Sequence, residues 1–275
     1  MVNYKYLFLI NKNTYHIIFD YIQAISINLK NDNINIILMK GLNCYNLFNN
    51  RKIHFINLKQ YIYNLKPNYI IYISEGDDKK YNNFYKINFL YQHFKKRLYF
   101  LNIEQLSRPN ILNFTLNIIK HCPKINLIDY SSLNILYLSK FIKNNIKLLE
   151  YPRCDFEIFN YPKKYDIACI KFKNSKSTRR QKIYNDMIDA GLNVKDIEGW
   201  GKERDNILFR CKILVNVHFD ENYNIFEEIR CNRCIYNDMI VISENCSFSD
   251  KIKLQNKIKF CKYEDIINTI KIVLD

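Results

Sequence analysis

The sequence predicts an α/β protein made of two Rossmann-like domains with a cleft between them. Short apolar runs alternate with segments of helical spacing, and several apolar runs end on polar residues, as buried parallel strands do. The alternation stops over 148–164, where two Tyr-Pro steps occur, and then starts again. We therefore predict domains at 1–150 and 151–275.

In the first half, each predicted strand is a short apolar run and most are followed by helical spacing. The predicted strands are 6–10, 34–39, 53–56 and 69–73, with further strands within the segments RLYFLNIEQL (97–106) and NLIDYSS (126–132). The predicted helices are 16–29, a segment ending at Pro67, 111–121 and 133–142. Proline ends the second of these because it lacks the amide hydrogen that a helix interior needs.

The second half repeats the pattern over fewer residues. The predicted strands are 165–170, 193–197, 212–217 and 239–243, with a further short one near 258–261. Helices are predicted at 181–190, 204–211, within 219–238 and at the C-terminus. Gly191 suits the turn that ends the first of these helices, because glycine adopts left-handed backbone angles without strain.

Composition favours a globular, soluble, cytoplasmic protein, in the host cytoplasm if the chain is viral. Of the 275 residues 48% are hydrophobic, and the apolar run before Asn11 is too short for a signal peptide or a membrane span. The net charge of +15 attracts anions, but the lysines are dispersed and the Asn, Ile, Lys and Tyr usage is typical of an AT-rich gene. We predict no specific nucleic-acid binding.

The nine cysteines are expected to be free thiols, because the number is odd and no secretory signal precedes them. Cys231 and Cys234 form one CxxC pair, for which a zinc site is the alternative. No P-loop, complete GxGxxG or GxSxG motif occurs, which counts against kinases, dehydrogenases and serine hydrolases.

Ligands of parallel α/β sheets bind beyond the carboxyl ends of the strands, near helix N-termini. Arg179 and Arg180 open a predicted helix there and could bind a diphosphate; the alternative is a solvated helix end. The segment Gly199-Trp200-Gly201 could let the backbone approach a nucleotide while Trp200 covers its base, or it could be a tight turn.

Four acids stand within nine positions in the segment FDENYNIFEE: Asp220, Glu221, Glu227 and Glu228. Carboxylates accept hydrogen bonds from vicinal hydroxyls, which a ribose or hexose offers, so a sugar nucleotide would use both the acids and the arginines. Capping of a helix N-terminus is one alternative. Another is a metal site formed by Asp220, Glu221 and His218.

The segments KILVNVH, FEEIR and VISE, with LNIEQL and DYSSLN in the first half, resemble GT-B glycosyltransferases over residues 95–250, in particular poorly characterised bacterial and viral members. The resemblance implies that the C-terminal domain binds the nucleotide sugar and the N-terminal domain faces the acceptor. It places Glu227 at the ribose with Arg230 beside it, and Glu228 there if the register shifts by one.

The resemblance also completes the predicted site. The donor-binding set is Arg179, Arg180, Gly199, Trp200, Gly201, Lys212, His218, Glu227, Glu228, Arg230, Ser243 and Glu244. The catalytic candidates are Asp220 and Glu221, facing the donor sugar, and Glu104 and Glu75, as the base if the configuration inverts, with Asp77 as a further possible base.

The predicted function is transfer of a sugar, with retention and without a metal or other cofactor, from a nucleotide-sugar donor to a glycan or other glycoconjugate acceptor. The donor is expected to be a UDP-sugar. The alternative is a catalytically silent, basic module that holds glycan or nucleic acid.

Overall fold

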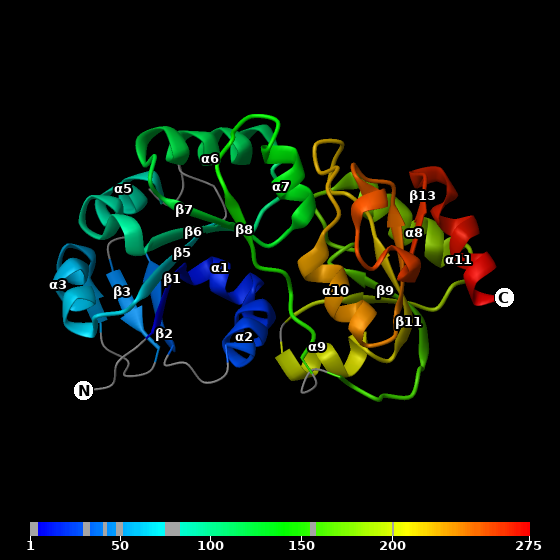
Figure 1. The fold of residues 1–275 in the computed structure, drawn as a ribbon. Coiled ribbons are helices and arrows are strands. Elements are labelled where there is room, and N and C mark those ends of the chain that lie inside the picture. The colour runs from blue at the N-terminus through cyan, green and yellow to red at the C-terminus, as the bar shows by residue number, and fades with distance from the viewer. Residues whose placement is uncertain are drawn as a thin grey trace. The chain divides into compact units, whose positions relative to one another are not determined.

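The computed structural model describes residues 5–29, 34–40, 43–47, 52–74, 83–154, 158–199 and 201–275. The chain forms two compact units, Met1–Pro152 and Arg153–Asp275, each with its own sheet (Figure 1). Within the described ranges, no helix combines the length and the apolar character needed to cross a membrane. The predicted acceptor and donor roles of the two halves stay predictions.

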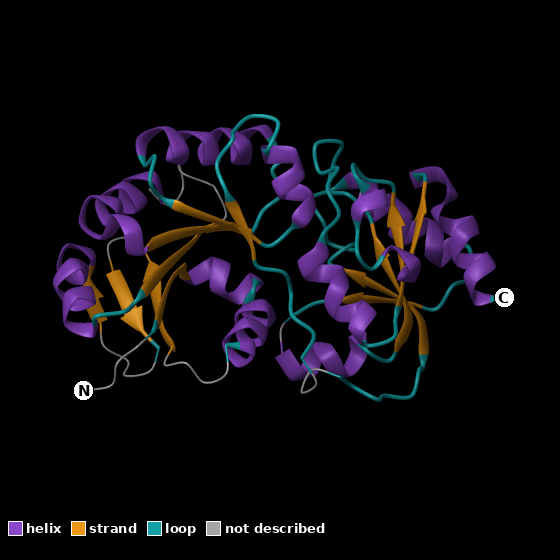
Figure 2. Ribbon diagram, viewed as in Figure 1, coloured by secondary structure: helices purple, strands orange, loops and turns teal. Residues whose placement is uncertain are grey.

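The N-terminal unit alternates strands and helices along the chain (Figure 2). Its strands are β1 (Tyr6–Asn11), β2 (Ile34–Lys40), β3 (Asn43–Asn46), β4 (Lys52–His54), β5 (Tyr69–Ser74), β6 (Leu98–Asn102), β7 (Asn126–Asp129) and β8 (Ile146–Leu148). Its helices are α1 (Lys12–Ile17), α2 (Phe19–Asn28), α3 (Phe55–Leu65), α5 (Asn83–Phe94), the 3-10 turn η1 (Lys95–Arg97), α6 (Pro109–His121) and α7 (Ser132–Leu138).

The eight strands form one sheet in the order β4-β3-β2-β1-β5-β6-β7-β8. Strands β2, β1, β5, β6, β7 and β8 run parallel, and β3 and β4 add an antiparallel edge. The carboxyl ends of the parallel strands therefore share one edge of the sheet and their amino ends share the opposite edge.

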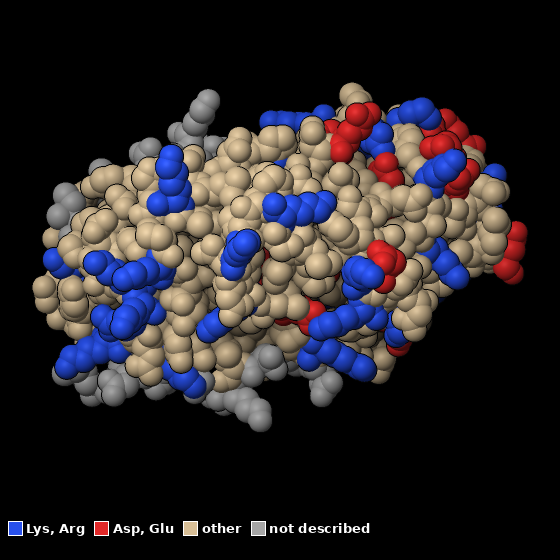
Figure 3. Space-filling view, turned by 45° about the horizontal axis from the view of Figure 1, so that its top comes forward, with Lys and Arg blue, Asp and Glu red and all other residues tan. Residues whose placement is uncertain are grey.

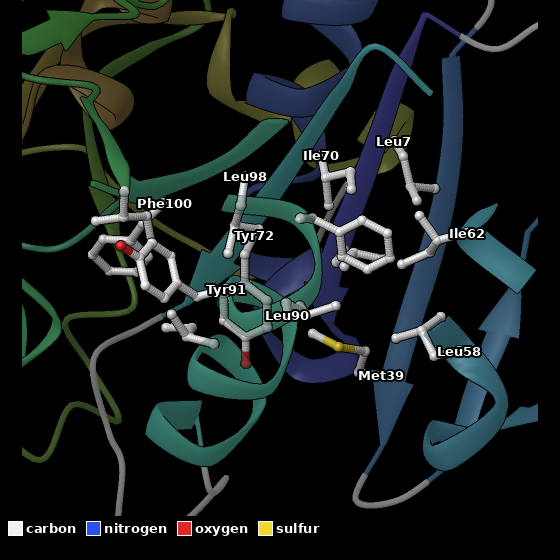
Figure 4. Packing of buried hydrophobic residues seen from close by; sticks show 14 of the residues in the cluster. Leu7, Met39, Leu58, Ile62, Ile70, Tyr72, Leu90, Tyr91, Leu98 and Phe100 are labelled. Carbon is white, nitrogen blue, oxygen red and sulfur yellow. The ribbon is translucent and has the colours of Figure 1, made fainter. Parts of the chain in front are cut away.

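The core of this unit fills the space between one face of the sheet and helices α3, α5 and α6. Alternate strand residues such as Leu7, Ile70 and Leu98 point into it and meet Ile62 and Leu90 from the helices (Figure 4). All five side chains are fully buried. Burial of such apolar side chains on each face is the main force that holds helices to the sheet.

The C-terminal unit is a smaller version of the same plan. Its strands are β9 (Tyr165–Ile170), β10 (Val194–Ile197), β11 (Cys211–Asn216), β12 (Ile240–Glu244) and β13 (Ile258–Cys261). Its helices are α8 (Thr178–Asp189), α9 (Gly201–Leu208), α10 (Glu228–Tyr236) and α11 (Ile266–Leu274), with 3-10 turns η3 (Ser249–Lys251), η4 (Gln255–Lys257) and η5 (Tyr263–Asp265).

Its five strands are all parallel, in the order β10-β9-β11-β12-β13. In chain order this is 2-1-3-4-5, the doubly wound arrangement in which the connections reverse direction between the first and third strands. Helices α8 and α11 pack on one face, where Ile183 and Ile270 meet Ile167 and Val215. Gly191 follows α8 with a φ of 75°, the left-handed backbone angle predicted for the turn that ends this helix.

The α/β class with two Rossmann-like halves is confirmed. The predicted helix 16–29 is instead two helices, because the chain bends at Ile18, between α1 and α2. Helix α5 and the strands β3 and β8 were not predicted; β3 alternates buried and partly buried residues in only four positions, too few for a periodic signal. Residues 146–148, at the start of the predicted linker, pair with β7 instead.

Candidate functional site

The carboxyl ends of β9, β11 and β12 hold a cluster of charged side chains in the C-terminal unit. Helix α8 follows β9 directly, and the segment leading to α10 follows β11. The strand order reverses between β9 and β11, and doubly wound sheets bind their ligands beyond the strand ends at such a point. The Ser177 hydroxyl caps α8 by accepting a hydrogen bond from the Arg180 amide at 3.3 Å.

Glu227 stands immediately before α10 and joins two arginines. Arg180 donates to its Oε1 at 3.1 Å and Arg230 to its Oε2 at 2.6 Å. Arg180 is only 7% exposed, and its Nε also donates to the Val217 carbonyl at 2.8 Å. Arg230 further reaches the Asn216 Oδ1 at 3.4 Å. The three charged groups form one network that carries a surplus positive charge.

Burial by itself raises the pKa of the Glu227 carboxyl, but the charges of Arg230 and Arg180 outweigh it and hold the pKa below its usual range. Glu227 is therefore ionised at neutral pH. Burial and the neighbouring Arg230 lower the pKa of Arg180, an effect that Glu227 opposes. Arg180 nevertheless stays positively charged at neutral pH, because a guanidinium has a very high pKa.

A second pair lies next to this network. Arg179 donates to Glu244, the last residue of β12, and its guanidinium lies 4.3 Å from the centroid of the Tyr263 ring. The Tyr263 hydroxyl donates to the Arg179 carbonyl at 2.9 Å, which fixes the start of α8. The second oxygen of Glu244 accepts from the His218 amide at 3.2 Å.

One ring nitrogen of His218 has no hydrogen-bond partner in the part of the chain that the structure describes. Its Nε2 lies 2.9 Å from the Asn245 carbonyl oxygen, so Nε2 carries a hydrogen and donates it. The side chain is only 4% exposed, and Nδ1 is buried with no hydrogen-bond partner among the residues that the structure describes. A buried polar atom left in this way is costly unless a ligand or water supplies the partner.

The structure thus brings together eight of the predicted donor-site residues at one edge of the sheet. Seven of them belong to α8, the start of α10 and the strand ends: Arg179, Arg180, His218, Glu227, Arg230, Ser243 and Glu244. The eighth, Glu228, is buried in the first turn of α10. Ser243 is fully buried and accepts from the Asn216 side-chain amide at 3.1 Å.

Lys212 does not join this cluster. It is the second residue of β11, at the amino edge of the sheet, and its ammonium lies 2.9 Å from Asp166 near the start of β9. Its place in the predicted donor-binding set is corrected, because a residue at the start of a parallel strand lies at the opposite edge from the strand ends.

The glycine pair has the backbone that glycine favours. Gly199 and Gly201 have φ values of 80° and 69°, and nothing lies within 4 Å of the position that an added Cβ would occupy at either. Trp200 falls outside the described residues. The glycines therefore permit a turn before α9; a role beside a nucleotide stays a prediction.

The predicted catalytic acids have different surroundings. Asp220 is partly exposed and accepts from the Asn222 amide at 2.8 Å, an arrangement typical of a turn, and Glu221 is exposed. Glu104 pairs with Arg108 at 2.9 Å in the N-terminal unit. Glu75 and Asp77 lie outside the described residues. The structure assigns none of these acids a catalytic role.

The cysteines are free thiols. Cys231 and Cys234 are both buried, and burial raises the pKa of Cys234 to about 12. In the described part of the chain, no three His, Cys, Asp or Glu side chains gather as a metal site. Neither the zinc alternative nor a metal site at His218, Asp220 and Glu221 receives support from the described geometry.

A buried polar network in the N-terminal unit joins the LNIEQL and DYSSLN segments. The Asp129 carboxylate accepts from Asn102 at 2.7 Å, from Asn134 at 3.0 Å and from the Ser131 amide at 2.9 Å. Both asparagine side chains also donate to the Glu104 carbonyl at 2.8 Å. The polar residues of these segments therefore hold the loop after β6.

Asp129 should make stability depend on pH. Burial raises the pKa of its carboxyl to about 7 from 3.8, although hydrogen bonds from Asn102, Ser131 and Asn134 oppose the rise. Between those two values the native state binds a proton that the unfolded chain lacks, so this group adds stability as pH falls through 7. The gain is complete only below the unfolded pKa.

The substitution Asp129→Asn should remove this pH dependence while lowering stability at every pH, because an amide cannot accept all the hydrogen bonds of the carboxylate. Unfolding by urea at about pH 8 and about pH 5.5 measures it: the difference between wild type and variant should be larger at the lower pH. Parallel pH profiles of the two proteins would contradict the raised pKa.

Sequence reasoning missed Asn216 and Tyr263. Asn216 links Arg230 to Ser243 at 3.4 and 3.1 Å, and Tyr263 lies beneath Arg179. Asn216 had a usable signal, because it is the polar end of the apolar strand β11. Tyr263 had none, since its contact with α8 crosses 84 positions of the chain.

Comparison with known proteins gives viral relatives and a structural class. No family model matches the chain. Uncharacterized protein L140 of Acanthamoeba polyphaga mimivirus is 33% identical over 182 residues, and uncharacterized protein L138 of the same virus is 29% identical over 279 residues. These alignments cover 62% and 97% of this chain but only 56% and 28% of the two relatives.

Among solved structures, the crystal structure of TarM superposes with a TM-score of 0.53 at 15% identity, over 84% of this chain and 53% of TarM. A TarM variant from S. aureus, in complex with Fondaparinux, alpha-GlcNAc-glycerol and UDP, gives a TM-score of 0.51 at 14% identity, over 85% of this chain and 55% of the variant. The chain has the fold of GT-B glycosyltransferases. At this identity the likeness defines fold and not activity.

Proposed function

We propose that the protein transfers a sugar from a nucleotide-sugar donor, a UDP-sugar, to a glycan acceptor, and that the C-terminal unit binds the donor. The observation that supports this most is the Arg180–Glu227–Arg230 network at the switch point of the sheet. Two arginines and the amides of two helix starts offer a diphosphate both charge and hydrogen bonds.

The donor's parts would divide among the cluster. The diphosphate would lie against Arg179, Arg230 and the first turn of α8, while Glu227 would accept hydrogen bonds from the ribose hydroxyls. The bare Nδ1 of His218 would accept a hydroxyl hydrogen of the donor. Each assignment gives a charged or buried polar group a partner that it can use.

In the proposed reaction the bond between the anomeric carbon and the diphosphate oxygen breaks, the acceptor hydroxyl oxygen forms the new bond to that carbon, and the hydroxyl proton passes to the departing diphosphate. The arginines and helix amides stabilise the negative charge on the departing diphosphate, so the reaction needs no metal ion. We propose retention of configuration at the anomeric carbon. The ligands of the TarM variant, UDP and alpha-GlcNAc-glycerol, support a nucleotide sugar and a glycan as partners.

A panel of UDP-, GDP- and dTDP-sugars should raise the melting temperature of the protein in a thermal-shift assay, with UDP-sugars giving the largest rise. Arg179→Ala should reduce the rise, because it removes a charge beside the proposed diphosphate position. Lys182→Ala is the matched control: this lysine lies on the same helix but is exposed and paired with Asp186 at 2.6 Å.

The Lys182→Ala variant should show the same rise in melting temperature as the wild-type protein. No shift with any nucleotide sugar in the wild-type protein, together with salt-sensitive binding of glycan or RNA, would replace this proposal with the catalytically silent module.

A further inference from the structure

The two units differ sharply in charge. Met1–Pro152 contains 20 Lys and Arg against 8 Asp and Glu, a formal charge of +12, while Arg153–Asp275 contains 22 against 19, a charge of +3. AT-rich coding raises lysine in both halves and so does not explain the difference. The N-terminal unit is distinguished by its shortage of acids.

Many of its cations precede the parallel strands of the sheet. Because those strands share a direction, the residues before them gather at one edge. We name this set the basic edge: Lys5, Lys66, Lys95, Lys96, Arg97, Lys124 and Lys147. On the face drawn in Figure 3, blue side chains are spread over this unit, at the left, with hardly any red among them.

Hydrogen bonds join the segments of the basic edge to one another. The Lys5 carbonyl accepts from the Asn68 amide at 3.1 Å, and the Arg97 side chain donates to the Pro67 carbonyl at 3.1 Å. The Asn126 side chain donates to the Lys96 carbonyl at 3.2 Å. The loops before β1, β5, β6 and β7 are thus neighbours, and the row from β1 to β8 extends about 19 Å at the usual strand spacing.

The acids of this unit that the structure describes lie elsewhere. Glu104, Asp129 and Glu150 stand at or just after the carboxyl ends of β6, β7 and β8, and Asp20 is in the first turn of α2. Among the described residues, no carboxylate stands in the loops that hold the basic edge. In the described part of this unit, the positive field of the basic edge has no carboxylate in the same loops to offset it.

Helix polarity explains only part of this arrangement. Lysines near a helix C-terminus are favoured by the helix dipole, which accounts for Lys66 after α3 and Lys95 after α5. Lys5, Lys124 and Lys147 lie outside the last turn of any described helix. A surface that collects cations beyond what its helices require fits an anionic partner.

Tyrosines line the same end of the sheet. The rings of Tyr6 and Tyr69 stack with centroids 5.0 Å apart, and Tyr99 meets Tyr69 edge to face at 5.7 Å. The Lys5 ammonium lies 5.4 Å over Tyr6 and the Lys147 ammonium 5.3 Å over Tyr99. The row is half-exposed and presents hydroxyl-bearing rings beside ammonium groups.

We propose that the basic edge binds a linear anionic glycan, as an anchoring site for an acceptor chain. This assignment rests on the proposed glycosyltransferase function for the identity of the partner. Single-stranded RNA is the competing polyanion, but it binds by stacking bases on free aromatic faces. Here neighbouring rings and lysines already contact the faces of Tyr6 and Tyr99, and six of the seven cations are lysines, which are point charges without the planar fork that suits nucleic acid.

The test uses the full chain and three probes: a heparin-derived octasaccharide, neutral maltooctaose and a uridine octanucleotide. Lys95→Glu with Lys96→Glu reverses two exposed charges of the basic edge. Lys12→Glu with Lys40→Glu changes the net charge equally, at exposed positions by the carboxyl ends of β1 and β2. Affinity is measured for each protein by fluorescence anisotropy at two salt concentrations.

The sulfated octasaccharide should bind the wild-type protein more tightly than the oligonucleotide, and maltooctaose should not bind. The first variant should weaken the sulfated probe about tenfold or more, and the second less than about threefold, because close charges dominate at physiological salt. Both variants should bind UDP as the wild type does, so failure here is separate from failure of the proposed donor site.

Three outcomes would overturn the proposal. If both variants lose affinity for the sulfated octasaccharide equally, the probe is attracted by the net charge of the protein and not by the basic edge. Tighter binding of the oligonucleotide, lost in the first variant, would assign the basic edge to RNA. If the sulfated octasaccharide does not bind the wild-type protein, the basic edge is not a binding site for anionic glycans.

Discussion

Asp205→Ala is expected to lower the free energy of unfolding by about 3–5 kcal/mol, the cost of leaving buried charges without their partner. Arg233 holds both carboxylate oxygens of Asp205 at 2.7 Å, and Arg204 holds one of them at 2.6 Å. The side chains of all three residues are at most 10% exposed. The alanine variant would leave two guanidinium groups with little access to water.

The pKa of Asp205 supports this expectation. Burial raises the pKa of Asp205, but the hydrogen bonds and charges of Arg233 and Arg204 lower it by more. The pKa is therefore below its usual range, and the carboxylate is ionised at neutral pH. Arg233 also lies 4.9 Å over the Phe209 ring, which places its charge among apolar side chains. The network connects α9 to α10 and so supports the helix that begins just after Glu227.

Urea unfolding followed by circular dichroism measures the effect. Asp166→Ala is the matched control, since partly exposed Asp166 and exposed Lys212 form a solvent-accessible pair at 2.9 Å whose loss should cost less than about 1 kcal/mol. If both variants unfold at the same urea concentration, the buried network does not contribute as argued.

Glu227→Gln is expected to weaken UDP binding about 10–100-fold, the range for a hydrogen bond to a charged group. The change keeps the shape of the side chain but removes the charge that faces Arg180 and Arg230. Calorimetry with UDP and with inorganic pyrophosphate separates two roles of this carboxylate. Pyrophosphate lacks a ribose, so its affinity should fall much less than that of UDP.

Glu228→Gln is the neighbouring control and also tests the register of the resemblance. Glu228 is buried in the first turn of α10, and its substitution should change UDP affinity less than about threefold. A larger loss in this variant would move the ribose contact to Glu228. Equal losses for UDP and pyrophosphate in Glu227→Gln would mean that Glu227 only holds the arginines in place.

Much of the fold was predictable because strands and helices leave periodic signals. The five parallel strands of the C-terminal unit were each expected near their observed positions, since they are short apolar runs bounded by polar loops. The missed helix α5 follows a segment rich in charge and Asn, and its own apolar residues alternate with Tyr, Lys and Asn. Such a mixture gives a weak periodic signal.

The site was only partly predictable, because its contacts cross long stretches of the chain. Arg180 and Glu227 are 47 positions apart, and Arg179 and Glu244 are 65 apart. The rule that ligands meet strand ends selected these residues in advance. Lys212 came from the resemblance and not from this rule, because it stands at the start of the predicted strand 212–217 and of the observed strand β11.

The sequence by itself determined the alternation of strands and helices and the presence of acids and arginines near the strand ends. Only the tertiary structure decided which of those charges pair, that Nδ1 of His218 is buried with no hydrogen-bond partner among the described residues, and that the cations of the basic edge lie together. The physical reason is the separation along the chain of the residues that interact. The periodicity of strands and helices depends on residues that are neighbours in the sequence, whereas ion pairs and burial depend on which distant segments the parallel strands bring together.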